Sequence, residues 1–306
     1  MHNYLRSVGF SKIKKRKELM EILYDVVRNY DERVVVENQE EETFIEYLKY
    51  YQDHSQDQMN VQTNTFGISV CGKYDEEQKF YIEYYYPFFK GTGITTKEKI
   101  SVERHAEKES YAGACDDLRI GITLIFYLQN PAEYLLQKRK DQISERNPSL
   151  TLSGLAREGK ILFPVMKDKE AVKVEQEASK NRTQMIEAAR DGDEEAMENL
   201  TMEEMDTYSI ISQRIVTEDV LSIVDTYFMP YGIECDQYNI MGEIIALSSV
   251  KNSSTGEEII RMTLDSNDVR YDICINREDL LGEPEIGRRF KGIIWLQGKI
   301  SNCTVG

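Results

Sequence analysis

The stretch Val269-Arg-Tyr-Asp-Ile-Cys-Ile275 decides how the C-terminal part of the chain folds. Its odd-numbered positions carry valine, tyrosine and two isoleucines, whereas its even-numbered positions carry arginine, aspartate and cysteine. Successive side chains of a β-strand point to opposite faces, so the apolar set shares one face. This period-two alternation of β-branched and aromatic residues predicts a half-buried strand.

Three further apolar runs flank this stretch, at residues 240–247, 259–264 and 290–300. The last of them carries the only tryptophan, Trp295. The connections between the first runs are rich in Asn, Asp, Ser and Gly, which are typical of tight turns. Glycines inside the strand patterns are typical of the bulges and sharp bends of small barrels.

The order of these elements resembles an OB-fold, so we expect a small OB-like β domain at residues 236–306. That barrel has five strands, and the four runs supply only four of them. The fifth strand is expected from residues 231–238, from the short C-terminal tail or from elsewhere in the chain. Without a fifth strand, the four runs predict a plain twisted sheet.

Residues 1–148 predict an α+β domain with a mostly antiparallel sheet. Ser11 is placed to cap a helix at 12–30, and apolar residues at helical spacing predict a short helix at 40–51. The expected strands lie at residues 66–74, 78–89, 99–106 and 118–128.

A helical segment is expected at residues 149–235, between the two β-rich parts. Asp193 is placed to cap one of its helices. Thr201 and Glu204 form a capping-box pair, which predicts the start of another helix. The whole chain is therefore predicted to be an α+β protein in three parts.

Composition excludes several classes of function. The 306 residues carry a formal charge of −16, which disfavours generic binding to nucleic acid or to an anionic membrane. No apolar run is long enough to span a membrane, and the start of the chain lacks an apolar signal segment. The five cysteines are scattered without metal-type spacing. These features predict a cytoplasmic protein without a cofactor.

The sequence contains few catalytic motifs. It has neither a phosphate-binding loop nor a nucleophile elbow, and it contains three histidines. The best candidate for chemistry is Glu103-Arg-His-Ala-Glu107, because Glu103, His105 and Glu107 share one face of a strand. Two carboxylates and an imidazole can bind a metal ion. An ordinary exposed polar strand face produces the same spacing.

Candidate ligand contacts come from two strands and a turn. An OB-type ligand surface uses the face of its second and third strands, where Arg261, Arg270 and Tyr271 are expected, with Lys251 and Asn252 from the first turn. The strand at 78–89 is rich in tyrosine, including Tyr84 and Tyr86. Dense tyrosine can form a stacking surface for a ligand, and it can equally form a core.

Two charged segments stand out. Residues 12–17 contain five cations, which oppose the dipole of the predicted helix. Residues 183–206 are strongly acidic. The first predicts either a solvated basic helix end or a local phosphate or carboxylate site. The second predicts either a solvated acidic face or a docking surface for a basic partner.

Two stretches carry a family resemblance: Met1-His-Asn-Tyr-Leu-Arg-Ser-Val-Gly-Phe-Ser-Lys12 and the segment from Asn276 to Gly298. Both look like an uncharacterised family of Firmicutes-type bacterial proteins, along the whole chain. The resemblance implies a cytoplasmic protein and brings no activity, cofactor or catalytic residue with it.

The leading hypothesis is a non-enzymatic binding protein whose C-terminal module contacts a protein segment or a short polymer. One alternative is a metal-dependent hydrolase that uses Glu103, His105 and Glu107. Another is a protein that binds single-stranded nucleic acid through Arg261, Arg270 and Tyr271. The oligomeric state does not follow from the sequence.

Overall fold

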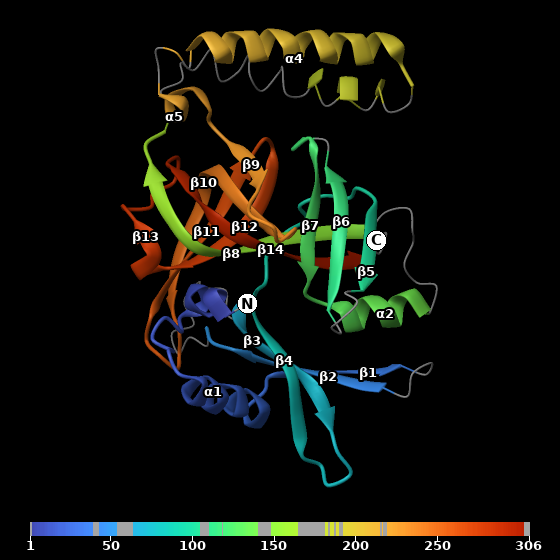
Figure 1. Cartoon of the computed structure of the whole chain (residues 1–306), viewed down its shortest axis with the longest axis vertical. Coiled ribbons are helices and arrows are strands. Elements are labelled where there is room, and N and C mark those ends of the chain that lie inside the picture. The colour runs from blue at the N-terminus through green and yellow to red at the C-terminus, as the bar shows by residue number, and fades with distance from the viewer. Residues whose placement is uncertain are drawn as a thin grey trace.

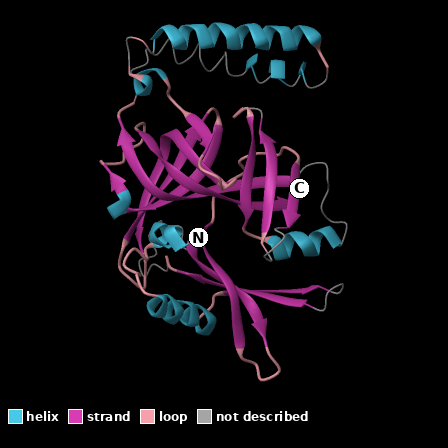
Figure 2. Cartoon of the chain, in the orientation of Figure 1, coloured by secondary structure: helices cyan, strands magenta, loops and turns pink. Residues whose placement is uncertain are grey.

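The computed structural model shows a mixed α+β chain built mainly from two sheets (Figures 1 and 2). It describes residues 2–38, 43–53, 64–104, 110–117, 119–139, 148–164, 181–182, 184–186, 188–189, 192–214, 216 and 219–302. Within these residues, no helix combines the length and the apolar character needed to cross a membrane.

The N-terminal sheet has four antiparallel strands in sequential order. They are β1 (Glu32–Asn38), β2 (Thr43–Tyr51), β3 (Phe66–Tyr74) and β4 (Phe80–Phe89). The short helix η1 (His2–Val8) and helix α1 (Arg16–Arg28) pack against this sheet. The buried residues of α1 are Leu19, Leu23 and Val26, whose spacing places them on one helical face.

The second sheet has ten strands and draws on every predicted part of the chain. Its strands are β5 (Ile100–Arg104), β6 (Tyr111–Asp117), β7 (Ile122–Leu128), β8 (Pro148–Leu162), β9 (Tyr227–Pro230), β10 (Gln237–Lys251), β11 (Glu258–Ser266), β12 (Val269–Asn276), β13 (Leu280–Leu281) and β14 (Arg289–Asn302). The described helices around it are α2 (Pro131–Arg139), α4 (Glu194–Arg214), α5 (Val220–Ile223) and η2 (Arg277–Asp279).

Five strands of this sheet pair in a closed ring. β10, β11 and β12 form an antiparallel meander, and β14 pairs with the other edge of β10. β8 then joins the two ends, because it runs parallel to β12 and antiparallel to β14. The C-terminal strands are therefore not a sheet of their own, since β8 closes their ring and β7 extends β14.

Glycine allows β8 to fit against β14. A Cβ atom on Gly159 would lie 2.3 Å from Cε2 of Phe290, whose side chain is fully buried in the core. Gly292 pairs with Gly159 across the two strands, and a Cβ there would lie 2.6 Å from Cζ of the same ring. The Phe290 ring thus occupies space that side chains on either strand would need.

The N-terminal part covers the outer face of the ring. Trp295, Leu155 and Cys274 belong to the same buried cluster as η1, α1 and the first sheet. The Trp295 ring lies 5.5 Å from that of Tyr4 in η1, measured between centroids. Strand β12 is consequently buried on both faces along most of its length, so the prediction of a half-buried strand was wrong.

Other predictions also need correction. Residues 43–51 form strand β2 and not a helix, and residues 148–162 form the long strand β8 and not part of a helical segment. Asp193 does cap α4, because its carboxylate accepts hydrogen bonds from the amides of Glu195 and Ala196. Thr201 lies inside that helix, where its hydroxyl donates to the carbonyl of Met197, so the capping box is absent.

Candidate functional site

A pocket of about 390 Å³ lies on the outer face of β10, β11 and β12, where the end of β4 meets the ring. The ring contributes Ala246, Leu247, Ser248, Arg261, Met262, Thr263 and Asp272. The N-terminal part contributes Thr65, Phe89, Lys90 and Thr92. Both sheets therefore shape the pocket.

Arg261 on β11 forms part of the pocket floor and is only 8% exposed. Its Nε donates to the hydroxyl of Ser248 at 3.2 Å, and its Nη1 donates to the hydroxyl of Thr65 at 3.1 Å. The carboxylate of Asp53, which is fully buried, lies 4.0 Å from Nη1. This partner supplies the counter-charge that a buried guanidinium requires.

Asp272 on β12 joins the ring to the segment after β4. One of its carboxylate oxygens accepts hydrogen bonds from both the amide and the hydroxyl of Thr92, each at 2.6 Å. The other accepts from the hydroxyl of Thr263 at 2.6 Å. Charge-assisted bonds of this kind fix the wall of the pocket.

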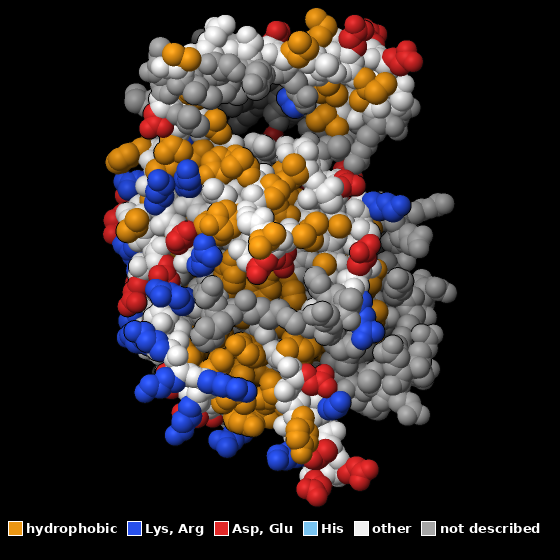
Figure 3. All heavy atoms as spheres, in the orientation of Figure 1, with side chains coloured by type: hydrophobic (Ala, Val, Ile, Leu, Met, Phe, Trp, Pro, Cys, Tyr) orange, Lys and Arg blue, Asp and Glu red, His pale blue; other side chains and the backbone are white. Residues whose placement is uncertain are grey.

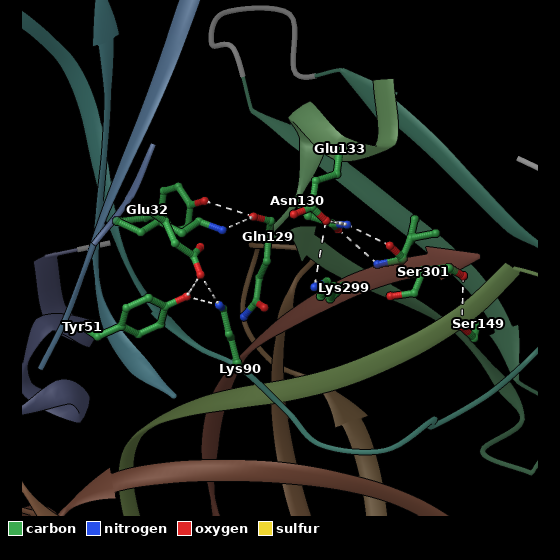
Figure 4. Close-up of polar contacts among 12 residues, drawn as sticks. Glu32, Tyr51, Lys90, Gln129, Asn130, Glu133, Ser149, Lys299 and Ser301 are labelled. Carbon is green, nitrogen blue, oxygen red and sulfur yellow. Dashed lines mark hydrogen bonds and ion pairs between the residues drawn. The ribbon is translucent and has the colours of Figure 1, made fainter. Parts of the chain in front are cut away.

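Lys90 forms the opposite wall and is held by two groups of the first sheet. Its Nζ lies 3.0 Å from the carboxylate of Glu32 and donates to the hydroxyl of Tyr51. Tyr51 donates in turn to Glu32 at 2.6 Å. Figure 4 shows Lys90 directed toward these two residues, with the side chain of Gln129 beside it.

Gln129 links the pocket to the interior between the sheets. Its amide nitrogen donates to the carbonyl of Phe89 and to the side chain of Gln297, both at 2.7 Å. The backbone carbonyl of Gln129 accepts from the ammonium of Lys49 and from the hydroxyl of Tyr86, both at 3.3 Å. Burial lowers the pKa of Lys49, and the nearby charge of Lys90 lowers it further.

The pocket wall thus combines four hydroxyls, two cations and one carboxylate with apolar side chains. Each charged group already has a partner of opposite charge or a hydrogen bond. Such a surface suits a polar ligand that exchanges hydrogen bonds and carries little net charge. In the described part of the chain, no group of three or more His, Cys, Asp or Glu side chains is arranged to hold a metal ion.

The structure brings one of the expected ligand residues of the ring into this pocket, namely Arg261. Arg270 is exposed outside the pocket lining and pairs with Asp265 at 3.1 Å. Tyr271 points into the core of the ring, where it is 1% exposed and shares a 2.9 Å hydrogen bond with Ser266. Its position in the alternating pattern assigns it to the interior, so its prediction as a surface contact was wrong.

The two expected turn residues lie apart from the pocket lining. Lys251 is exposed at the end of β10. Asn252 is 1% exposed, and its amide donates to the carbonyl of Val8 at 2.7 Å. Its side-chain oxygen also accepts from backbone amides of the turn, so it fixes the turn and η1 and cannot contact a ligand at the surface.

The tyrosine-rich strand is mainly core. Tyr86 is fully buried, and the hydroxyl of the half-buried Tyr84 donates to that of Tyr47 at 3.3 Å. Burial raises the pKa of both Tyr84 and Tyr86. Of the proposed metal ligands, Glu103 is exposed on β5, whereas His105 and Glu107 lie outside the described residues.

Sequence reasoning missed Lys90, Thr92 and Asp272. Asp272 had been assigned only to the polar face of its strand. Lys90-Gly-Thr-Gly93 has the composition of a turn, and only its approach to the ring turns it into a pocket wall. No local sequence signal marks that approach.

Residues 5–298 match the family model described as "Domain of unknown function, E. rectale Gene description (DUF3881)", so the chain belongs to this family. The match confirms the resemblance to an uncharacterised bacterial family. No curated protein and no solved structure matches the chain.

Proposed function

We propose that this member of the DUF3881 family is a binding protein whose five-stranded ring is an OB-like barrel. In this proposal β8 is the fifth strand, and the pocket on β10, β11 and β12 receives a short polar segment of a partner protein. The observation that carries the proposal is the position of the pocket. It lies on the outer face of the second and third strands of the meander, β11 and β12, which is the ligand face of OB-folds.

The strand pairing supports the barrel part of the proposal. A meander of three strands is followed by β14, which pairs back to the first of them. The ring is completed by one parallel pairing, between β12 and β8. Because β8 precedes the meander in the chain, the closing strand comes from the N-terminal side. This order supports β8 as the fifth strand of the proposed barrel.

The chemistry of the pocket supports a peptide ligand. Its hydroxyls and its well-paired charges match the hydrogen-bonding groups of a peptide backbone better than a polyphosphate, which requires clustered free cations. A volume of about 390 Å³ lies in the range of small-ligand sites, so it accommodates a few residues. The overall charge of −16 further disfavours nucleic acid.

Selection from a random peptide library tests the proposal. Ala246 is exposed and lines the pocket, so Ala246→Trp fills the pocket while keeping a residue that strands accept. Glu76→Trp, in the distant β3–β4 turn, is the matched control. Peptides selected on the native protein are expected to bind Ala246→Trp at least about tenfold more weakly and Glu76→Trp equally well.

Two results would overturn the peptide assignment. One is a set of peptides that bind the filled variant as tightly as the native protein. The other is salt-sensitive binding of an oligothymidylate that Ala246→Trp abolishes, which would make the ligand a nucleic acid. The hydrolase alternative depends on Glu103, His105 and Glu107, and stoichiometric zinc or manganese in the purified protein would support it.

A further inference from the structure

The basic segment, which we define as residues 12–17, is an exposed charge cluster with few counter-charges among the described residues. Lys12, Lys14, Lys15, Arg16 and Lys17 are all exposed. Across the described residues, no acidic side chain pairs with the first four, and Lys17 has one contact of 3.9 Å to Glu21. Figure 3 shows Lys and Arg side chains gathered at the lower left, over α1.

The local fold makes this cluster electrostatically unfavourable. Helix α1 begins at Arg16, so the cations surround the positive end of its dipole. Glu18 already accepts a hydrogen bond from the amide of Lys14. The chain's own carboxylate therefore occupies part of the helix N-terminus, and a single bound phosphate is a poor fit. Five side-chain charges in six residues fit an extended partner with several carboxylates.

Helix α4 presents a surface of that chemistry. Glu194, Glu195, Glu198 and Asp206 are exposed on it, together with Met202 and Met205. At 3.6 residues per turn these six side chains share one side of the helix. Methionine adapts readily to a partner surface, so the face combines charge with deformable apolar area.

Within one molecule the two surfaces are held apart. Figure 1 shows α4 at one end of the long axis and α1 toward the other. Figure 3 shows acidic and apolar side chains over α4 and basic ones over α1. Screening limits charge interactions in physiological salt to roughly 8 Å, so each cluster acts only on what touches it.

We propose that the basic segment of one molecule binds the exposed face of α4 in a second copy of this chain. The contact joins two different surfaces, so it is heterologous and links copies head to tail. Such an assembly is reversible and weakens as salt rises, because most of its contacts are exposed ion pairs. It is independent of the pocket and of the function proposed for it.

Sedimentation velocity of the full chain at low and high salt tests this assembly. One variant carries Lys14→Glu, Lys15→Glu and Lys17→Glu, which favours the α1 dipole and so preserves folding. A second carries Glu195→Lys, Glu198→Lys and Asp206→Lys on α4. The control carries Lys73→Glu, Lys79→Glu and Lys97→Glu, which changes three exposed lysines elsewhere.

The native chain and the control are expected to self-associate at low salt and to dissociate at high salt. Each charge-reversed variant alone is expected to stay monomeric, and an equal mixture of the two is expected to associate again. A native chain that is monomeric at every concentration at low salt would overturn the proposal. So would a mixture that fails to associate, or a monomer that instead binds poly-glutamate or an oligonucleotide through the basic segment.

Discussion

The packing of Phe290 against β8 gives a quantitative test of ring closure. A Cβ atom at Gly159 would lie 2.3 Å from Cε2 and 2.5 Å from Cζ of that ring, and Phe290 is fully buried. Overpacking of this kind costs about 1–3 kcal/mol. Removing glycine from the unfolded chain offsets roughly 0.5 kcal/mol of that cost. Gly159→Ala is therefore expected to lower the free energy of unfolding by about 1.5 kcal/mol.

The same geometry predicts strong coupling between the two positions. Phe290→Leu alone leaves a cavity and is expected to cost about 1–2 kcal/mol. In the Phe290→Leu variant, the new methyl group at position 159 enters the space that the aromatic side chain of Phe290 has left. Gly159→Ala should then cost close to nothing, which corresponds to a coupling energy of about 1–2 kcal/mol.

Urea unfolding followed by tryptophan fluorescence measures this cycle, because Trp295 is the only tryptophan and lies on β14. Gly113→Ala is the matched control. A Cβ atom at Gly113 would lie 2.2 Å from Cζ of Phe126, so the substitution crowds a different aromatic side chain from Phe290. Gly113→Ala and Phe290→Leu should add within about 0.5 kcal/mol. Equal additivity for Gly159→Ala and Phe290→Leu would refute the packing of β8 on β14.

Two further predictions concern buried cations. Burial lowers the pKa of Lys49. At pH values just below the ordinary lysine pKa of about 10.4, the folded protein therefore binds fewer protons than the unfolded chain. The free energy of unfolding consequently rises with pH in that range. Lys49→Met should raise the free energy of unfolding by roughly 1 kcal/mol at neutral pH. Denaturation curves should show this gain in stability shrinking toward pH 10, and a gain that does not depend on pH would contradict the prediction. Arg289 donates to the carbonyls of Leu221, Val224 and Phe163 at 2.9–3.0 Å. Arg289→Lys cannot reach all three, so hydrogen exchange at residues 219–226 should accelerate about tenfold, and unchanged exchange would contradict this anchoring.

Several strands in both sheets could be predicted because their own sequences carry a β-strand pattern. Strand β12 alternates strictly, and β3 and β4 were expected within two residues of their observed limits. These segments have strong β-propensity and end at turn residues, so local chemistry and tertiary structure agree. Strand β2 was instead predicted as a helix. From Tyr47 to Tyr51 its side chains are buried or half-buried on both faces, and its apolar spacing therefore resembled a helix.

Strand β8 could not be predicted, because the features that suit it to the ring hide it in the sequence. Gly154 and Gly159 lower its β-propensity, yet a Cβ atom at Gly159 would collide with Phe290 and one at Gly154 would crowd Ile294 at 3.0 Å. Ser153 is buried as well, because its hydroxyl donates to the carbonyl of Phe89. Such residues are chosen by their neighbours on other strands, which a single sequence does not reveal.

The candidate site also contains some residues that the sequence predicts and others that it does not. Arg261 was predicted from its place on the second strand of the meander, and it lies on the pocket floor. Lys90 and Thr92 were missed, because their role depends on how the first sheet approaches the ring. Asp53 could not be predicted either, since nothing in its local sequence indicates that it supplies the counter-charge of Arg261.

The position of the first sheet against the five-stranded ring also limits the surface that is open at the pocket. The N-terminal part covers Trp295, Leu155 and Cys274 on the outside of the ring, so much of that surface is closed to a ligand. Thr92 and Lys90 then fix the edge of what stays open, because Asp272 holds one and Glu32 and Tyr51 hold the other. On the function proposed above, the junction between the sheets would limit the length of a bound segment, and β11 and β12 would supply most of its polar contacts.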